Sequence, residues 1–168
     1  MNLWNNYGWK VEDIHYPVSS WIPKENTKIK VQRLHENAMP PFRATEESAG
    51  LDFMSAYDYK LLKGTTKKVN TGIAVEIPKG YVGILSIRSS LAKQGLSLAN
   101  SIGVIDSDYR GSVDALIRYA GEGESYSLSR GDRVFQMLVI PVSIVDVKVV
   151  NELSSTERGD GGFGSTGK

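Results

Sequence analysis

The amino-acid sequence predicts an all-β domain, either a sandwich, a barrel or a jelly roll, and three observations lead to this class. Apolar residues recur at every second position through short stretches, rather than at the helical period of 3.6 residues. Turn signals such as Lys63-Gly64 and Arg130-Gly131 separate these stretches. No amphipathic stretch of the sequence is long enough for a major helix. With 168 residues, the chain has the size of one domain that buries its own core.

The first predicted element is an N-terminal extension, residues 1–26. It holds all three tryptophans among mostly polar residues and shows no clear period. Two interpretations stay open for it: a strap that packs on the sandwich or on a neighbouring subunit, or a segment that binds a protein partner. The β-domain itself is expected to span residues 27–150.

Alternating apolar residues predict the strands of this domain, and one short helix lies between them. The clearest strands are predicted at 28–34, 72–78 and 143–150. Residues 89–96 suit a helix of one or two turns that ends at Gly95. The last segment, 151–168, is rich in glycine, serine and threonine, and we expect it to be a flexible arm.

The composition argues against several classes of protein. Lys and Arg number 20 and Asp and Glu number 19, a formal net charge of +1, which gives no general attraction for nucleic acid or anionic membranes. The absence of cysteine excludes disulfides, and His15 and His35 are too isolated for a zinc site, so a metal would need oxygen ligands. No segment resembles a signal peptide or is long enough to span a bilayer. We expect the protein in the cytoplasm of its cell or host.

The C-terminal residues 162–168 match GxxxxGK, the first part of a phosphate-binding P-loop. A P-loop also needs a hydroxyl residue after its lysine and a helix that follows, and the sequence has neither after Lys168. The glycine-rich arm could still wrap a phosphate chain.

Five segments gather charged, hydroxyl and glycine residues in combinations that a core alone does not need. In chain order they read SAGLDFMSAYD, IRSSLAKQG, NSIGVIDSDYRG, RGDRVFQM and RGDGGFGSTG. Together they resemble the five motifs of the trimeric dUTP pyrophosphatases (dUTPases). The resemblance runs from about Lys28 to Lys168 and leaves only the extension uncovered. It implies a distorted jelly roll of the dUTPase type that hydrolyses dUTP to dUMP and pyrophosphate, which limits uracil in DNA and supplies dUMP for thymidylate synthesis.

Asp106 is the candidate catalytic residue. From the residues alone, this carboxylate after the apolar GVI stretch could either cap a turn or act as a general base on a water aligned with phosphorus. The resemblance implies the base, with the water attacking the α-phosphorus. It also implies that Tyr109 lies under the deoxyribose and excludes a 2′-hydroxyl.

The other site residues follow from the resemblance in the same way. Asn100 and the backbone around Gly103 are implied to bind uracil. The implied phosphate contacts are Ser89, Ser90 and Gln136 in the domain and Arg158, Ser165 and Thr166 in the arm, while Phe163 of the arm covers the base. Asp52 and Arg88 are implied to support the site at a subunit interface.

The resemblance further implies magnesium carried by the substrate's own phosphates, and a homotrimer with shared sites. The first, second and fourth motifs would come from one subunit, Asp106 and Tyr109 from a second, and the arm from the third.

Three points depart from this family or compete with it. Phe135 stands where dUTPases usually have a small residue. The related dCTP deaminases share the fold, but their catalytic Glu would fall at Leu116. The third alternative is a regulatory protein-binding module built on a dUTPase scaffold.

Overall fold

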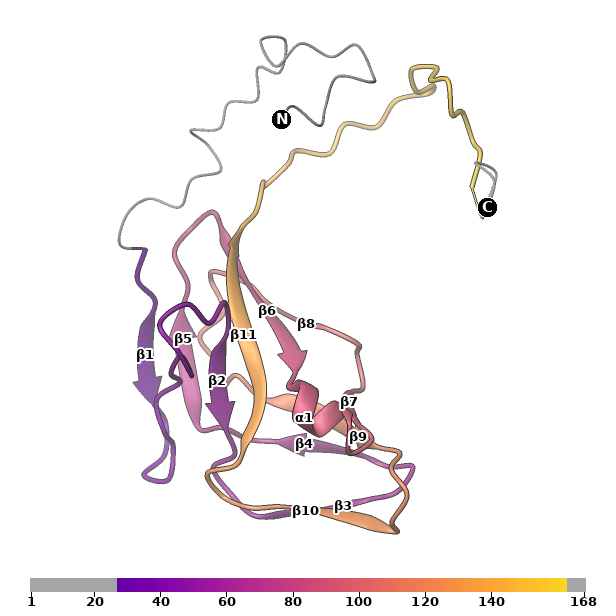
Figure 1. Ribbon diagram of the computed structural model, residues 1–168. Helices are drawn as coiled ribbons and strands as arrows, with labels where there is room; N and C mark the ends of the chain where they lie inside the picture. Colours follow the sequence, from indigo (N-terminus) through magenta and orange to yellow (C-terminus); the bar gives the residue numbers. More distant parts are fainter. Residues whose placement is uncertain (1–26, 163–168) are drawn as a thin grey trace, which may run out of the picture.

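The computed structural model describes residues 27–162, and nearly all its regular structure is β (Figure 1). The predicted all-β class is confirmed. The described strands are β1 (Lys30–Arg33), β2 (Leu51–Met54), β3 (Tyr59–Leu62), β4 (Thr66–Val69), β5 (Ile73–Glu76), β6 (Tyr81–Ile87), β7 (Leu96–Leu98), β8 (Gly103–Ile105), β9 (Ala115–Tyr119), β10 (Ser125–Leu128) and β11 (Arg133–Pro141). One short helix, α1 (Ser89–Ala92), follows β6. Within this range, no helix is long and apolar enough to cross a membrane.

The strands form two larger antiparallel sheets and two ribbons. The order β2-β11-β6-β8 makes a four-stranded sheet, and β4-β9-β7 makes a three-stranded sheet. The ribbons pair β1 with β5 and β10 with β3. A single hydrophobic core takes side chains from all four, including Phe53, Leu61, Ile73 and Ile117. Burial of these apolar faces stabilises the fold.

The central strand β11 positions residues of the site through a bulge. Its register against β2 shifts between Arg133 and Phe135, so Val134 and Phe135 are both fully buried. A bulge inserts one extra residue and changes which side chains share a face. Arg133 therefore donates a hydrogen bond to Asp52 of β2, and Gln136, three positions later, is the residue that pairs with Asp52 in the sheet register.

Phe135, where the family has a small residue, is accommodated in the core. Its ring stacks on that of Phe53, with centroids 5.1 Å apart and planes 15° from parallel. Phe135 points into the core, and its neighbour Gln136 is only partly buried. Because successive residues of a strand point to opposite faces, the larger ring does not obstruct the side chain of Gln136.

The structure bears out two of the three predicted strands and the helix. β1 lies within 28–34, β5 lies within 72–78, and α1 makes one turn followed by Gly95 in a left-handed conformation (φ 82°).

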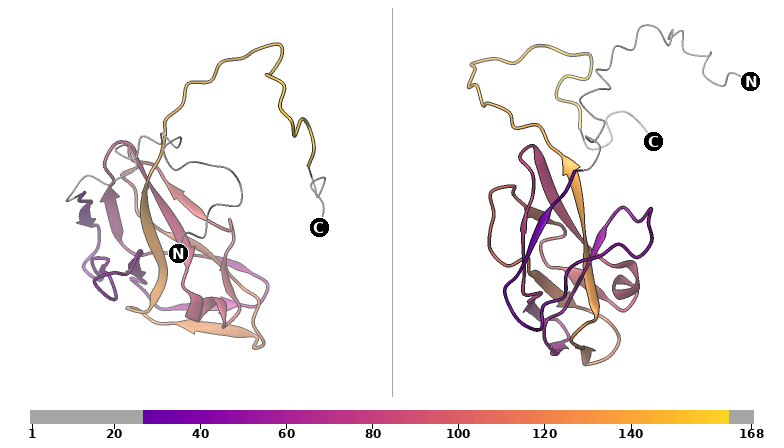
Figure 2. Two further views of the ribbon diagram at one scale, coloured as in Figure 1. Left: turned by 45° about the horizontal axis from the view of Figure 1, so that its top comes forward. Right: turned by 90° about the vertical axis from the view of Figure 1, so that its left-hand side faces the viewer.

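The predicted strand at 143–150 is wrong. This segment has no regular structure, and Ile144, Val147 and Val149 are 81%, 89% and 91% exposed. Figures 1 and 2 show the chain leaving the sheets after β11. A strand needs a neighbour for its backbone hydrogen bonds, and the alternation of apolar residues does not say whether that neighbour is in the same chain.

Candidate active site

The predicted site residues fall into two groups in the structure. The first group, the arginine cluster, contains the predicted residues Asp52, Arg88, Ser89, Ser90 and Gln136 from β2, the end of β6, α1 and β11. Arg133 of β11, which was not predicted, joins them. The second, the hairpin site, lies in the turn before β8, on β8 and in the connection from β8 to β9: Asn100, Gly103, Asp106 and Tyr109.

Asp52 is the centre of the arginine cluster. Its Oδ1 accepts a hydrogen bond from Nε of Arg88 (3.1 Å), and its Oδ2 accepts one from Nη1 of Arg133 (3.0 Å). The carboxylate is 5% exposed, a burial that these two charged partners compensate. With two guanidinium groups on one carboxylate, the cluster keeps one net positive charge, which suits an anionic ligand.

Gln136 pairs with Asp52 of β2, and the glycine just before β2 makes room for its side chain. A Cβ placed on Gly50 would lie 2.7 Å from Oε1 of Gln136, too close for two non-bonded atoms. Gly50 therefore leaves the room that the amide of Gln136 occupies. This amide can donate hydrogen bonds to an oxyanion.

The serines of the arginine cluster follow Arg88 directly. The Arg88 carbonyl accepts hydrogen bonds from the N–H groups of Leu91 and Ala92, both at 3.0 Å, which fixes the turn that carries Ser89 and Ser90. Both serines are exposed. Hydroxyl and guanidinium donors thus come together at one end of β6.

In the hairpin site, Gly103 is required by close packing. A Cβ on this glycine would lie 2.9 Å from Cδ1 of Leu85, its partner on β6. The exposed Asn100 precedes it in a tight turn, in which Ser101 adopts a positive φ of 62°. This geometry brings the backbone of β8 close to β6 and places Asn100 in the turn that leads into β8.

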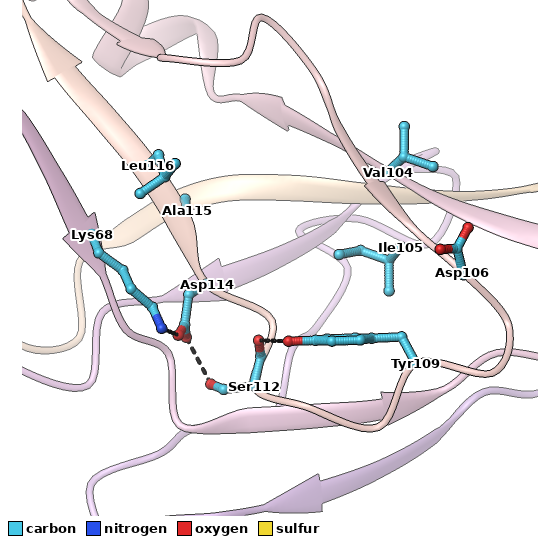
Figure 3. A pocket seen from close by; sticks show the side chains of 9 residues that line it. All are labelled: Lys68, Val104, Ile105, Asp106, Tyr109, Ser112, Asp114, Ala115 and Leu116. Carbon is cyan, nitrogen blue, oxygen red and sulfur yellow. Dashed lines mark hydrogen bonds and ion pairs between the residues drawn. The ribbon is translucent and has the colours of Figure 1, made fainter.

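A pocket of about 410 Å³ opens beside β8 and β9 (Figure 3). Its lining residues are Lys68, Val104, Ile105, Asp106, Tyr109, Ser112, Asp114, Ala115 and Leu116. The pocket is apolar along β8 and β9 and polar around its rim, as is usual for a site that takes a small molecule.

Tyr109 is fixed at the rim of this pocket from two sides. Its hydroxyl donates to the carbonyl of Ser112 (3.1 Å), and its backbone N–H donates to the carbonyl of Asp106 (3.2 Å). A Cβ on Gly111 would lie 2.6 Å from Cζ of the ring, so the hydroxyl end of the ring packs closely against that glycine. Asp106 and Tyr109 therefore lie next to each other in the lining of the pocket, and both are exposed.

Behind Tyr109, Lys68 of β4 and Asp114 form an ion pair with Nζ 2.9 Å from Oδ2. Hydrogen bonding to the Asp114 carboxylate raises the pKa of Lys68 above its usual value. Sequence reasoning missed this pair together with Arg133. The RGDRVFQM segment contains Arg133 but does not reveal its partner, and alternation gives no signal for Asp114, which precedes β9.

The hairpin carboxylate and the arginine cluster lie at opposite ends of β6 within one chain. The register pairs Ile105 with Gly83, which places Asp106 beside Val82. Arg88 is six residues further along, from 82 to 88, or about 20 Å at the rise of a strand. One chain therefore does not bring Asp106 to the arginine cluster.

The remaining predicted residues are those of the arm and Leu116, the position that would distinguish a dCTP deaminase. Arg158 is exposed and donates from Nε to the carbonyl of Gly161 (2.9 Å). Phe163, Ser165 and Thr166 lie outside the described residues. Leu116, where a deaminase would need a glutamate, lines the pocket with an apolar side chain.

Comparison with known proteins gives one consistent family. The dUTPase family model matches residues 36–167. A deoxyuridine 5′-triphosphate nucleotidohydrolase of Anaplasma marginale (strain St. Maries) is 46% identical over 145 residues, which are 83% of this chain and 98% of the relative. The corresponding protein of Hydrogenobaculum sp. (strain Y04AAS1) is 42% identical over 142 residues, which are 83% of this chain and 98% of that relative.

Solved structures with similar folds are dUTPases as well. The Staphylococcus bacteriophage 80alpha dUTPase with dUPNHPP has a TM-score of 0.79 and 29% identity, and the match covers 85% of this chain and all of that one (100%). That phage enzyme is described as controlling the transfer of virulence genes. A mutant dUTPase from phage phi11 of S. aureus, described as coordinating a structural Mg(II) ion, has a TM-score of 0.69 and 27% identity over 74% of this chain and 97% of its own.

Proposed function

The chain belongs to the dUTPase family, and from this membership we propose how its residues hydrolyse dUTP. The fold is the jelly roll of that family, and the activity is that of a dUTP nucleotidohydrolase. The roles of individual residues, the subunit arrangement and the metal are the proposal. The predicted cytoplasmic location and the protein partner of the extension stay predictions.

The chemical step that we assign to Asp106 is removal of a proton from water. The water oxygen attacks the α-phosphorus, its proton passes to the Asp106 carboxylate, and the bond from the α-phosphorus to the oxygen that bridges to the β-phosphorus breaks. dUMP and pyrophosphate leave. An exposed carboxylate at the rim of a pocket can reach such a water, and phosphoryl transfer requires mainly positioning and charge neutralisation from the protein.

The pocket of the hairpin site would hold the nucleoside. Tyr109 packs closely on Gly111 and donates a hydrogen bond to the Ser112 carbonyl, so its ring would offer a fixed surface under the sugar. A fixed ring leaves no room for a 2′-hydroxyl, which favours dUTP over UTP. The amide of Asn100 and the backbone near Gly103 would pair with the polar edge of uracil.

The arginine cluster would bind the phosphates. Its net positive charge would attract the phosphate oxygens. The Gln136 amide and the hydroxyls of Ser89 and Ser90 can donate hydrogen bonds to these oxygens. We assign the magnesium ion to the substrate, coordinated by phosphate oxygens and water, because Mg²⁺ prefers such ligands and the cluster mainly offers N–H and O–H donors. Arg158, Ser165, Thr166 and Phe163 of the arm would close over the γ-phosphate and the base.

The subunit arrangement follows from the separation along β6. A water on the α-phosphorus must lie next to Asp106 while Gln136 contacts the same phosphate, yet β6 pairs Gln136 with Ser86, about 13 Å from Val82 at the rise of a strand. The two halves of one site therefore come from different subunits, in support of the homotrimer with shared sites. The exposed apolar residues at 144–149 support assembly as well, because such a segment is suited to contact with another chain.

The observation that carries the proposal is that Asp106 and Tyr109 line the same pocket. Its test is pyrophosphate release from dUTP, UTP, dCTP and dTTP side by side, with and without magnesium. We expect dUTP to be the preferred substrate and magnesium to accelerate it. Equal rates on dUTP and UTP would contradict the role of the hairpin site, and ammonia release from dCTP would point to a deaminase.

A further inference from the structure

A chain of polar contacts connects the ring of Tyr109 to the interior of the protein. The Tyr109 hydroxyl donates to the carbonyl of Ser112 (3.1 Å), and Oγ of Ser112 donates to Oδ1 of Asp114 (2.6 Å). Nζ of Lys68 lies 2.9 Å from Oδ2 of the same carboxylate. Figure 3 shows these four side chains in sequence along one wall of the pocket.

Asp114 is the anchored end of this chain. Its side chain is 7% exposed, and it also accepts hydrogen bonds from the backbone N–H of Thr71 (3.3 Å) and from Nδ2 of Asn70 (3.4 Å). Thr71 is fully buried and donates from Oγ1 to the carbonyl of Val113 (2.7 Å). The carboxylate is thus held by β4 and by the turn before β5, both parts of the rigid framework.

The residues that precede the half-buried Ser112 are more exposed. Residues 108–110 are exposed, and Tyr109 itself is 43% exposed. A ring that rejects a substrate through steric exclusion must stay in place, because movement of about 1 Å opens the space it should block. This part of the site therefore needs an anchor outside itself.

We propose that Asp114 is a positioning residue for sugar selection: through Ser112 it holds the turn of residues 109–112 and keeps the Tyr109 ring in place. The inference rests on the proposed role of Tyr109 under the deoxyribose. Asp114 touches neither the substrate nor the reacting atoms. Lys68 neutralises the Asp114 carboxylate in the pocket wall, with Nζ 2.9 Å from Oδ2.

The test compares kcat/KM for dUTP with kcat/KM for UTP in four variants of the full chain. Asp114→Ala removes the anchor, and Asp114→Asn keeps an oxygen that accepts from Ser112. Tyr109→Ala reports the proposed role of the ring. Asp58→Ala is the matched control, because it removes another carboxylate that accepts a hydrogen bond from a backbone N–H, that of Arg130 at 2.7 Å, and Asp58 lies in a pocket with Asn37 and Tyr57 that includes no residue of the 109–112 turn.

We expect Asp114→Ala to lower the dUTP-to-UTP ratio by about threefold to tenfold, the effect of losing one or two hydrogen bonds. Asp114→Asn should restore at least half of that loss on a logarithmic scale, and Asp58→Ala should leave the ratio unchanged. Added to Tyr109→Ala, Asp114→Ala should change the ratio no further, since the two act through the same ring.

Each alternative result decides the question. If Tyr109→Ala lowers the ratio and Asp114→Ala does not, the positioning role is overturned and the role of Tyr109 stands. If neither changes the ratio, both are overturned, while dUTP hydrolysis itself stays measurable. Should Asp114→Ala fail to fold, Ser112→Ala replaces it, because Asp114 then keeps Lys68, Asn70 and Thr71, and an unchanged ratio there overturns the inference equally.

Discussion

Two aspartates of this chain differ in what surrounds them, and that difference separates their roles. Asp52 is 5% exposed and both of its oxygens accept from arginines, so its charge is used within the protein. Asp106 is exposed at the rim of a pocket. A carboxylate already committed to two guanidinium groups is a poor proton acceptor, whereas an exposed one can bind and deprotonate water.

Replacement of Asp106 by asparagine therefore tests the chemistry at a single residue. We expect kcat for dUTP to fall by roughly two to four orders of magnitude, the usual contribution of a general base, because the amide cannot accept the proton. The melting temperature and the affinity for a non-hydrolysable dUTP analogue should change little, since Asp106 is exposed. Turnover close to that of the native enzyme would remove Asp106 from the mechanism.

The sequence predicts residues such as Asp106 and Tyr109 because their signal is local. Both lie within one short segment, NSIGVIDSDYRG, whose composition a strand alone does not need. Arg133 and Asp114 carry no such signal. Arg133 reaches Asp52 through a bulge in β11, and Asp114 pairs with Lys68, 46 residues away (114 minus 68) in the chain. Partners that meet only through the sheet register are invisible to a reading of one segment.

At the scale of elements, the same limit explains the strand wrongly predicted at 143–150. Strands β1 and β5 were predicted correctly because each pairs with the other inside the chain. Residues 143–150 alternate equally well but lie exposed. Periodicity identifies a segment that is able to pair, and only the tertiary or quaternary structure supplies the partner.

The C-terminal arm gives a prediction at this scale. Among the described residues 151–162, the hydrogen bonds are local, such as Gly159 N–H to the Thr156 carbonyl (3.1 Å) and Arg158 Nε to the Gly161 carbonyl (2.9 Å). Truncation after Ser155 should therefore leave the melting temperature nearly unchanged while turnover of dUTP collapses. Deletion of Lys168 alone, the control, should leave turnover intact. A sharp fall in melting temperature would instead assign the arm a structural role.

The ribbon of β1 and β5 gives a prediction about pH. The Lys30 ammonium donates to Glu76 across the ribbon at 2.7 Å, and this hydrogen bond lowers the pKa of Glu76 below its usual 4.5. A carboxyl whose pKa is lower in the folded state stabilises the fold above its unfolded pKa, and this contribution is lost as the pH falls through the folded pKa.

Glu76→Gln should accordingly lower the melting temperature slightly at pH 7, and this difference should disappear once the pH lies below the folded pKa of Glu76, where both proteins lack the charge. The difference at pH 7 should shrink in high salt, because the pair is on the surface. Melting curves of the two proteins across this range measure it. A constant difference at all pH values would mean that Glu76 acts through packing instead of charge.

For the whole molecule, the decisive distance is the length of β6. With Asp106 beside Val82 and the arginine cluster beginning at Arg88, about 20 Å of strand separates the proposed base from the proposed phosphate site. Under the proposed roles, a complete site needs both halves around one α-phosphate, so we propose that a single chain carries two half-sites. Closed rotational symmetry then turns the half-sites of several identical chains into equivalent complete sites.

Shared sites predict that two inactive proteins rescue each other. One is Asp106→Asn with its arm intact, and the other is truncated after Ser155 with Asp106 intact. After the two are dissociated, mixed in equal amounts and reassembled, a site draws a good Asp106 from one subunit half the time. It draws a good arm from another subunit half the time, so about a quarter of the sites, one half times one half, should be competent.

Each inactive protein carried alone through the same treatment is the control, and it should stay at background. A tag on one of the two proteins, used to isolate mixed assemblies, shows that exchange took place. If each chain built its whole site by itself, every site in a mixed assembly would lack either the base or the arm, and activity would stay at background. Because β6 holds the two half-sites apart in one chain, we expect the mixed assemblies to regain activity.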